Sequence, residues 1–356
     1  MNNICLSDGY FAAANSRNGF ISYDSSLFGN VSFIYIVKGG PGTGKSSFMR
    51  SIALEALNNA FDVEYFWCSS DPSSLDGIII KKGDESFAFW DGTAPHSADL
   101  KIPGVNSQFF DLGQFWDISY LAHHADKIKH IISQKSNCYG SAYRMLSSAA
   151  SIDDEIAFLA SEYTHHQKLQ NYVKRICGGI TGGKSGNVRR LFTACISGCG
   201  ELRTATFENS AENAYFIDEK YRIYPEFFAL LADELLNKGC SIDISLSPLD
   251  PNVIDGIYVH DTKSCFVISH QNDSVTKSKY VNSKRFIDGD VFSLRRHRIR
   301  ELLKLHGVMM NDALFSLEKA RQLHSELEAF YGAAMDFTRL ERYKKEITST
   351  LFDTRK

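Results

Sequence analysis

The sequence predicts an α/β protein built as a tandem duplication, in which each unit contains a parallel β-sheet and is followed by a helical hairpin. Three observations lead to this fold class. Residues 45–91 align without a gap onto residues 224–270, with 11 identities in 47 positions. Strand-like runs alternate with helical patterns, as in parallel sheets with right-handed crossovers. Residues 117–176 and 291–350 contain no proline and have apolar residues three and four positions apart.

The length and composition indicate a two-domain protein. A chain of 356 residues that is 44% hydrophobic and 23% charged can bury a large core and exceeds the usual size of one domain. We expect one domain at 1–187, with helices at about 117–176, and a second at 188–356, with helices at about 291–350. The formal net charge is −3, which does not indicate binding to nucleic acid through bulk charge.

No signal-peptide pattern and no apolar stretch of roughly 18 residues is evident in the sequence. We therefore expect a cytoplasmic protein that does not bind membranes. The eight cysteines form no CxxC pair, and we expect them to be reduced. The oligomeric state is left open.

The repeat continues beyond the ungapped alignment, at nearly constant offsets. The aligned pairs that lie 179 residues apart include Asp71 and Asp250, Asp76 and Asp255, and Phe87 and Phe266. Upstream, Phe11 corresponds to Phe192 at an offset of 181, and downstream Ala142 corresponds to Ala313 and Ile156 to Leu327. Because repeats change what a motif means, the two units are best compared position by position.

Each element of the first unit has a local signal. A hairpin is expected at 10–23, around the turn sequence NSRNG. The β-branched and aromatic run FIYIV at 33–37 is typical of a buried parallel strand. A helix with the pattern FMRSIALEALNN begins near Lys45, and further strands are expected at 62–67 and 86–90.

The sequence GGPGTGKS between the first strand and this helix fits the phosphate-binding P-loop pattern GxxxxGK[ST]. Its glycines allow successive backbone N–H groups to surround a phosphate, and the helix N-terminus favours the same charge. Lys45 is expected to reach the β- and γ-phosphates, and the Ser46 hydroxyl to bind Mg²⁺. The residues expected to bind nucleotide here are Gly39, Gly40, Pro41, Gly42, Thr43, Gly44, Lys45, Ser46 and Ser47.

Two aspartates are candidates for roles beside the P-loop. Asp91 ends a strand and resembles the Walker B position, so with Ser46 it is a candidate Mg²⁺ ligand. Asp71 lies in the DPxxxDGI element, which recurs in the second unit and is therefore interpreted as architectural, with Asp71 as a helix N-cap. The alternative is that Asp71 orients the attacking water.

The second unit provides an internal comparison. Opposite Lys45, Ser46 and Asp91 it carries Tyr224, Pro225 and His270. An aromatic residue and a proline do not supply an ammonium and a hydroxyl, so this unit is expected to have lost its phosphate site.

Two further segments allow alternative interpretations. The loop DGTAPHSADL, with His96 and Asp99, either contacts the γ-phosphate or a second substrate, or is a solvated loop. The sequence GGITGGKS at 178–185 also fits the P-loop pattern, but it follows a helical pattern instead of a strand. We interpret it as a linker between the units.

The stretch KGGPGTGKSS resembles the P-loops of RecA-like and KaiC-type ATPases. Together with CSSDPSSLDGI and DGTAPH, it looks like an uncharacterised family of duplicated bacterial P-loop ATPase-like proteins. The likeness spans most of the chain, with specific motifs confined to residues 38–99. It implies a P-loop NTPase-like unit that binds nucleotide through Gly39, Gly44, Lys45 and Ser46. No catalytic glutamate follows the second strand, which departs from that pattern.

Three functions are compatible with these features. The first is Mg²⁺-dependent ATP binding with slow hydrolysis coupled to rearrangement of the two units, acting on an unknown protein partner. The second is a small-molecule or nucleotide kinase that uses the DGTAPH loop to hold an acceptor. The third is a nucleotide-bound structural module without turnover. In the first case, an arginine of the second unit is a candidate for contacting the γ-phosphate: Arg189, Arg190, Arg295, Arg296, Arg298 or Arg300.

Overall fold

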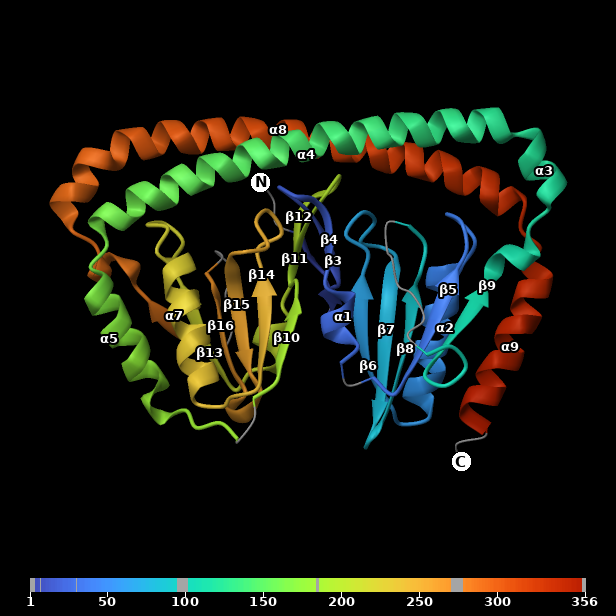
Figure 1. Ribbon diagram of the computed structural model, residues 1–356, viewed down its shortest axis with the longest axis horizontal. Coiled ribbons are helices and arrows are strands. Elements are labelled where there is room, and N and C mark those ends of the chain that lie inside the picture. Colours follow the sequence, from blue (N-terminus) through green and yellow to red (C-terminus); the bar gives the residue numbers. More distant parts are fainter. Residues whose placement is uncertain are drawn as a thin grey trace.

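The chain forms two α/β units of similar construction, each centred on a six-stranded sheet (Figure 1). The computed structural model describes residues 4–6, 8–29, 31–94, 102–183, 186–269 and 278–353. The first sheet has the strand order β2 (Tyr10–Phe11), β6 (Asp62–Trp67), β7 (Leu75–Lys82), β8 (Glu85–Asp91), β5 (Phe33–Lys38) and β9 (Ser107–Asp111).

The second sheet repeats this order. Its strands are β10 (Val188–Leu191), β14 (Ile242–Leu246), β15 (Ile254–Val259), β16 (Ser264–Ile268), β13 (Asn213–Ile217) and β17 (Ser278–Val281). Each strand occupies the same place as its counterpart in the first unit. The three-dimensional structure therefore confirms two similar units.

The expected parallel sheet is only partly confirmed, because both sheets are mixed. In the first unit β5 pairs in parallel with β8 and β9, whereas β7 is antiparallel to both β6 and β8. The sequence analysis missed β7, whose run GIII is rich in β-branched residues. Only Gly83 and Asp84 join β7 to β8, and such a short connection can join only antiparallel strands. Gly83 has a φ of 57°, as a tight hairpin turn requires.

The two units meet at short hairpins beside the sheets. The first hairpin consists of β3 (Ala13–Ser16) and β4 (Gly19–Ser22) and confirms the expected hairpin. The second consists of β11 (Ala194–Ser197) and β12 (Gly200–Thr204), and β12 also pairs with β1 (Ile4–Leu6). Phe11 and Phe192 exchange backbone hydrogen bonds of 2.8 and 3.0 Å. Because these two residues are equivalent positions of the repeat, an approximate two-fold axis passes between them.

The helices comprise one on each sheet and a set that links the units. Helix α2 (Lys45–Asn58) packs on the first sheet and α7 (Tyr224–Asn237) on the second. The longest are α4 (Ala125–Tyr163) and α8 (Gly289–Ala333), which are followed by α5 (His166–Ile176) and α9 (Phe337–Asp353). Short helices complete the set: α1 (Asp24–Leu27), α3 (Ile118–His123), α6 (Thr206–Ser210) and the 3-10 turns η1 (Leu112–Phe115), η2 (Cys177–Gly179), η3 (His260–Thr262) and η4 (Ser283–Phe286).

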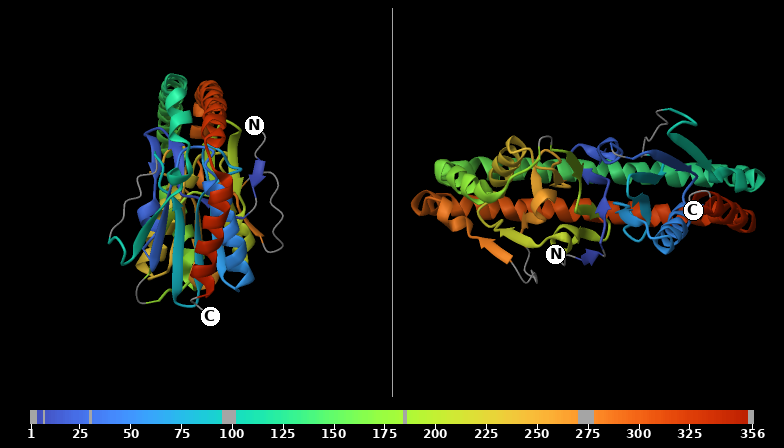
Figure 2. Two further views of the ribbon diagram at one scale, coloured as in Figure 1. Left: turned by 90° about the vertical axis from the view of Figure 1, so that its right-hand side faces the viewer. Right: turned by 90° about the horizontal axis from the view of Figure 1, so that it is seen from below.

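The expected helical hairpin within each unit is wrong, because the helices cross to the opposite unit. Helices α4 and α8 pack side by side and antiparallel above both sheets (Figures 1 and 2). At 1.5 Å per residue, the 39 residues of α4 span about 58 Å, which is long enough to reach from one unit to the other. Helix α5 then packs on α7, and α9 packs on α2.

Matching hydrogen bonds fix both crossings. Asp117 N donates to Ala334 O at 2.7 Å, and Asp288 N donates to Tyr163 O at 2.7 Å. Asp117 and Asp288 are 171 residues apart, and so are Tyr163 and Ala334. This is also the offset between Ala142 and Ala313. The helical regions are therefore a structural repeat as well.

Within the described ranges, no helix combines the length and the apolar character needed to cross a membrane.

Candidate functional site

The segment between β5 and α2 forms a tight loop. Gly42 and Gly44 have φ angles of 68° and 82°, in the left-handed region that favours glycine. The buried Thr43 hydroxyl donates to the Gly40 carbonyl at 2.8 Å. A Cβ at Gly39 would lie 2.6 Å from Thr43 Oγ1. The glycines of the motif are therefore required by the conformation of the loop.

The loop leads directly into the first turn of α2, which begins at Lys45. No side chain caps this N-terminus, and its first turn contains no acidic residue. The unpaired N–H groups of a helix N-terminus and its dipole favour an anion at that position. Ser47 is exposed in the same turn, and Pro41 is half-buried in the loop. Strand, loop and helix thus follow one another as a P-loop requires.

Lys45 and Asp91 lie together beside the loop. The Lys45 ammonium donates to the carbonyls of Gly39 and Gly40 at 3.1 and 2.7 Å. It lies 3.6 Å from Asp91 Oδ2, with the two side chains 11% and 15% exposed. Asp91 is brought there because β8 pairs with β5, with Val37 opposite Asp91. Low exposure strengthens this ion pair relative to one on an open surface.

The surroundings of Asp91 tie it to the loop. Its carboxylate accepts a hydrogen bond from Thr93 N at 2.7 Å, and the Thr93 hydroxyl donates to Gly39 O at 2.6 Å. Burial raises the pKa of Asp91, an effect that the charge of Lys45 opposes and that of Asp76 reinforces. A carboxylate that pairs with Lys45 and is tied to the loop through Thr93 is well placed to respond to a ligand in the loop.

Ser46 links α2 to the sheet. Its hydroxyl oxygen accepts a hydrogen bond from Leu75 N at 3.0 Å. This contact connects the first turn of the helix to the start of β7. Ser46 and Asp91 supply two oxygen donors, the kind of ligand that Mg²⁺ takes together with water and phosphate.

Asp71 does not begin a helix, so the N-cap interpretation is wrong. Its carboxylate accepts hydrogen bonds from Ser73 N, from the Ser73 hydroxyl at 2.8 Å and from the Ser74 hydroxyl at 2.8 Å. These contacts shape a turn that leads into β7. The preceding strand β6 is separated from β5 by β7 and β8, so Asp71 does not follow a strand that is adjacent to β5.

The end of α8, which belongs to the second unit, covers the P-loop. A Cβ at Gly40 would lie 2.8 Å from the Tyr331 ring, and one at Gly42 would lie 2.6 Å from the carbonyl oxygen of Glu328. Beyond the end of α8, Leu340 and Phe337 of α9 would lie 3.4 and 3.9 Å from a Cβ at Gly44. Contacts this close leave the loop and the helix little room to move independently.

Charged side chains of the long helices gather at the same place. Lys135 Nζ of α4 lies 3.3 Å from His324 Nδ1 of α8. Burial, together with the charges of Lys135 and Lys45, lowers the pKa of His324 to about 4. Burial and the charge of Asp71 raise the pKa of Glu328, against the effects of Lys45 and Lys135. Charged groups of the long helices, of the turn at 71–74 and of the loop before α2 therefore influence one another and form one electrostatic cluster.

The sequence analysis missed Lys135, His324, Glu328 and Tyr331. They have no motif, but comparison of the helical repeats at an offset of 171 would have singled them out. The equivalent residues of the other repeat are His306, Asp153, Ala157 and Ala160. The substitutions change charge or size at positions that face the two loops.

The corresponding place in the second unit is closed by side chains. Arg222 has a φ of 53° and lies 3.4 Å from both Asp153 Oδ1 and the Tyr224 hydroxyl. His306 lies 3.5 Å from Asp153 on its other side. Pro225 lies in the first turn of α7. A network of side chains therefore stands where the first unit has its glycine loop.

The structure does not support the expected contact of a second-unit arginine with the γ-phosphate, because two of the candidate arginines pair with carboxylates in other places. Arg189 bridges Glu64 and Asp243, and Arg295 pairs with Glu162 at 2.6 Å. Arg190, Arg296, Arg298 and Arg300 are exposed. The last three lie in the half of α8 that is above the second unit (Figure 1).

Several residues singled out in the sequence lie outside the described residues: His96, Asp99, Lys184, Ser185 and His270. The described part of GGITGGKS begins within η2, and the next element along the chain is the strand β10 instead of a helix. This context differs from that of the first loop.

Within the part of the chain that the structure describes, no group of three His, Cys, Asp or Glu side chains is arranged to hold a metal ion. No protein-family model, curated protein or solved structure matches this chain. Functional interpretation therefore depends on the geometry of the site itself.

Proposed function

We propose that the chain is a Mg²⁺-dependent ATPase of low turnover, in which the nucleotide bound at the P-loop controls the seating of α8 and α9 on the first unit. The observation that carries this proposal is the contact of Gly40 and Gly42 with Tyr331 and Glu328. A change in loop conformation is transmitted to α8 because no space separates the two.

The P-loop residues have distinct tasks in this proposal. Lys45 would exchange its two loop carbonyls for the β- and γ-phosphate oxygens of ATP, since charged phosphate oxygens are better acceptors for an ammonium. The uncapped first turn of α2 would bind the same phosphates. Ser46 and Asp91 would hold Mg²⁺, which neutralises phosphate charge when bound.

The cluster on the long helices supports the coupling to hydrolysis. Lys135 is the cation that the tertiary structure brings to this site, and it would take the role that we had assigned to an arginine. Its neighbour His324 stays neutral at pH 7 because its pKa is lowered to about 4. Asp71 remains the candidate for orienting the attacking water, although its carboxylate is held by Ser73 and Ser74.

Phosphate release by the full chain tests the proposed reaction. We expect free phosphate from Mg-ATP without any acceptor, at a rate below about 1 s⁻¹, slower than typical kinases. Replacement of Asp91 by asparagine should lower this rate by about tenfold or more, because a charged ligand of the metal is lost. Transfer to an added acceptor without free phosphate would favour the kinase alternative, and neither product would favour the structural module.

Hydrogen exchange tests the coupling to α8. We expect Mg-ATP to slow amide exchange in residues 328–340 by about fivefold or more, because the ligand stabilises the state in which loop and helix are packed. The equivalent segment at 157–169 faces the second unit and is the matched internal control. Equal protection of both segments, or of neither, would contradict the coupling.

A further inference from the structure

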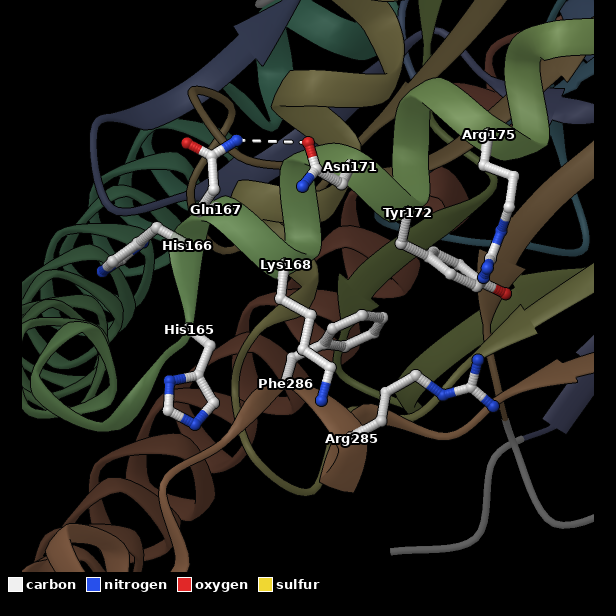
Figure 3. Close-up of a pocket in the computed structure, with 9 residues that line it drawn as sticks. All are labelled: His165, His166, Gln167, Lys168, Asn171, Tyr172, Arg175, Arg285 and Phe286. Atoms are coloured by element: carbon white, nitrogen blue, oxygen red, sulfur yellow. Dashed lines mark hydrogen bonds between the residues drawn. The ribbon is translucent and has the colours of Figure 1, made fainter.

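A cavity of about 1060 Å³ lies between α5 and the turn η4, on the side of the second unit. Figure 3 shows Lys168, Tyr172 and Arg175 projecting from α5 toward Arg285 and Phe286 of η4. In Figure 1, α5 and the P-loop are at opposite ends of the molecule. The cavity is thus a separate place from the site described above.

The lining is cationic and contains no carboxylate. Two guanidinium groups, those of Arg175 and Arg285, lie 5.0 and 5.3 Å from the centre of the Tyr172 ring. Across the described chain, no carboxylate forms an ion pair with Lys168, Arg175 or Arg285. Two like charges thus lie near each other at the Tyr172 ring, and among the described residues no carboxylate offsets their repulsion through an ion pair.

The equivalent place in the first unit shows that these charges are not a requirement of the fold. The aromatic pair is present in both, with Tyr172 and Phe286 at 5.2 Å and Tyr343 and Phe115 at 5.5 Å. In the first unit, glutamate and glutamine stand where the second has its two arginines.

The offset of 171 relates Arg175 to Glu346, Arg285 to Gln114, and Lys168 to Arg339. Among the described residues, the shared aromatic frame therefore has guanidinium groups over its tyrosine ring only in the second unit.

We propose that this cavity binds a small molecule that carries phosphate groups. Guanidinium groups bind phosphate oxygens through two parallel hydrogen bonds, and Lys168 adds a third cation. The volume is close to the upper limit of ordinary small-molecule pockets. The proposal does not depend on nucleotide binding at the P-loop.

Calorimetric titration with inorganic pyrophosphate tests this inference at about 0.15 M salt, where long-range attraction is screened. The full chain carries Lys45→Ala in every titration, so that binding of pyrophosphate at the P-loop is weakened. We expect Arg175→Glu with Arg285→Gln, which installs the residues of the first unit, to weaken pyrophosphate binding at least tenfold. All three cationic side chains are exposed, so the fold should be unaffected, as equal thermal midpoints would verify.

The matched control is Arg339→Ala, which removes a cation from the equivalent face and should leave binding within about twofold. Absence of binding by the parent chain, or equal binding by the double variant, would overturn the proposal. Tighter binding of a single-stranded oligonucleotide than of pyrophosphate, lost in the same variant, would also overturn it, because the ligand would then be a nucleic acid.

Discussion

Lys45→Ala is expected to abolish most of the stabilisation that Mg-ATP gives to the full chain. With ATP at 100 times its dissociation constant, the free energy of unfolding of the wild type should rise by about 2.7 kcal/mol. Loss of the ammonium would remove the proposed charge-assisted contacts to two phosphates, which should weaken binding about 100-fold. At the same ATP concentration, the gain for the variant then falls to about 0.4 kcal/mol.

The measurement is the shift in the unfolding midpoint with and without Mg-ATP, taken separately for each variant. Because each variant is compared with itself, the shift does not include the small loss of stability caused by removing the hydrogen bonds from Lys45 to Gly39 and Gly40. Lys184→Ala, in the second GxxxxGK[ST] sequence, is the control and should respond like the wild type. Calorimetry should also give one nucleotide per chain. If the ATP-induced shift of Lys45→Ala equals that of the wild type, the site is not at this loop.

Arg189→Met is expected to destabilise the protein by about 3–5 kcal/mol, the usual cost of breaking a buried ion pair. Arg189 lies between the two sheets, with Glu64 of the first unit at 2.8 Å and Asp243 of the second at 2.6 Å. Asp243 is only 3% exposed, and the variant would leave it with His260, at 3.1 Å, as its remaining side-chain partner. Urea denaturation at pH 7 measures the loss.

Arg190→Met is the matched control, because Arg190 is the next residue of β10 and is exposed. We expect its free energy of unfolding to stay within about 0.5 kcal/mol of the wild type. Equal stability of both variants would show that the ion triad contributes nothing between the units. Since Arg189 is occupied by its partners, a folded Arg189→Met protein should also retain its rate of phosphate release.

The same triad predicts the direction of a pH effect. Burial tends to raise the pKa of Asp243, but hydrogen bonding to His260 and the charge of Arg189 outweigh it, so that the folded-state pKa is lowered. A lowered carboxyl pKa contributes stability above the unfolded value of about 3.9 and loses it as the pH falls through the folded value. The stability difference between wild type and Arg189→Met should therefore shrink below about pH 4.

The sequence by itself determined the elements whose signals are local. The strand at 33–37, the helix after Lys45 and the hairpin at 13–22 follow from residue type and spacing within a few positions. The duplication was also readable, because offsets of 179, 181 and 171 residues are properties of the sequence. In the structure, the loop between β5 and α2 has left-handed glycines at Gly42 and Gly44, and Lys45 lies 3.6 Å from Asp91.

Only the tertiary structure decided how these elements meet. The exchange of helices between units depends on the lengths of α4 and α8 and on the contacts at their far ends, which no short segment encodes. The same exchange brings His324 and Glu328 of α8 to a loop that lies almost 300 residues earlier in the chain, where they meet Lys135 of α4. Such residues have no local signal, because their role arises from packing between segments that are distant in sequence.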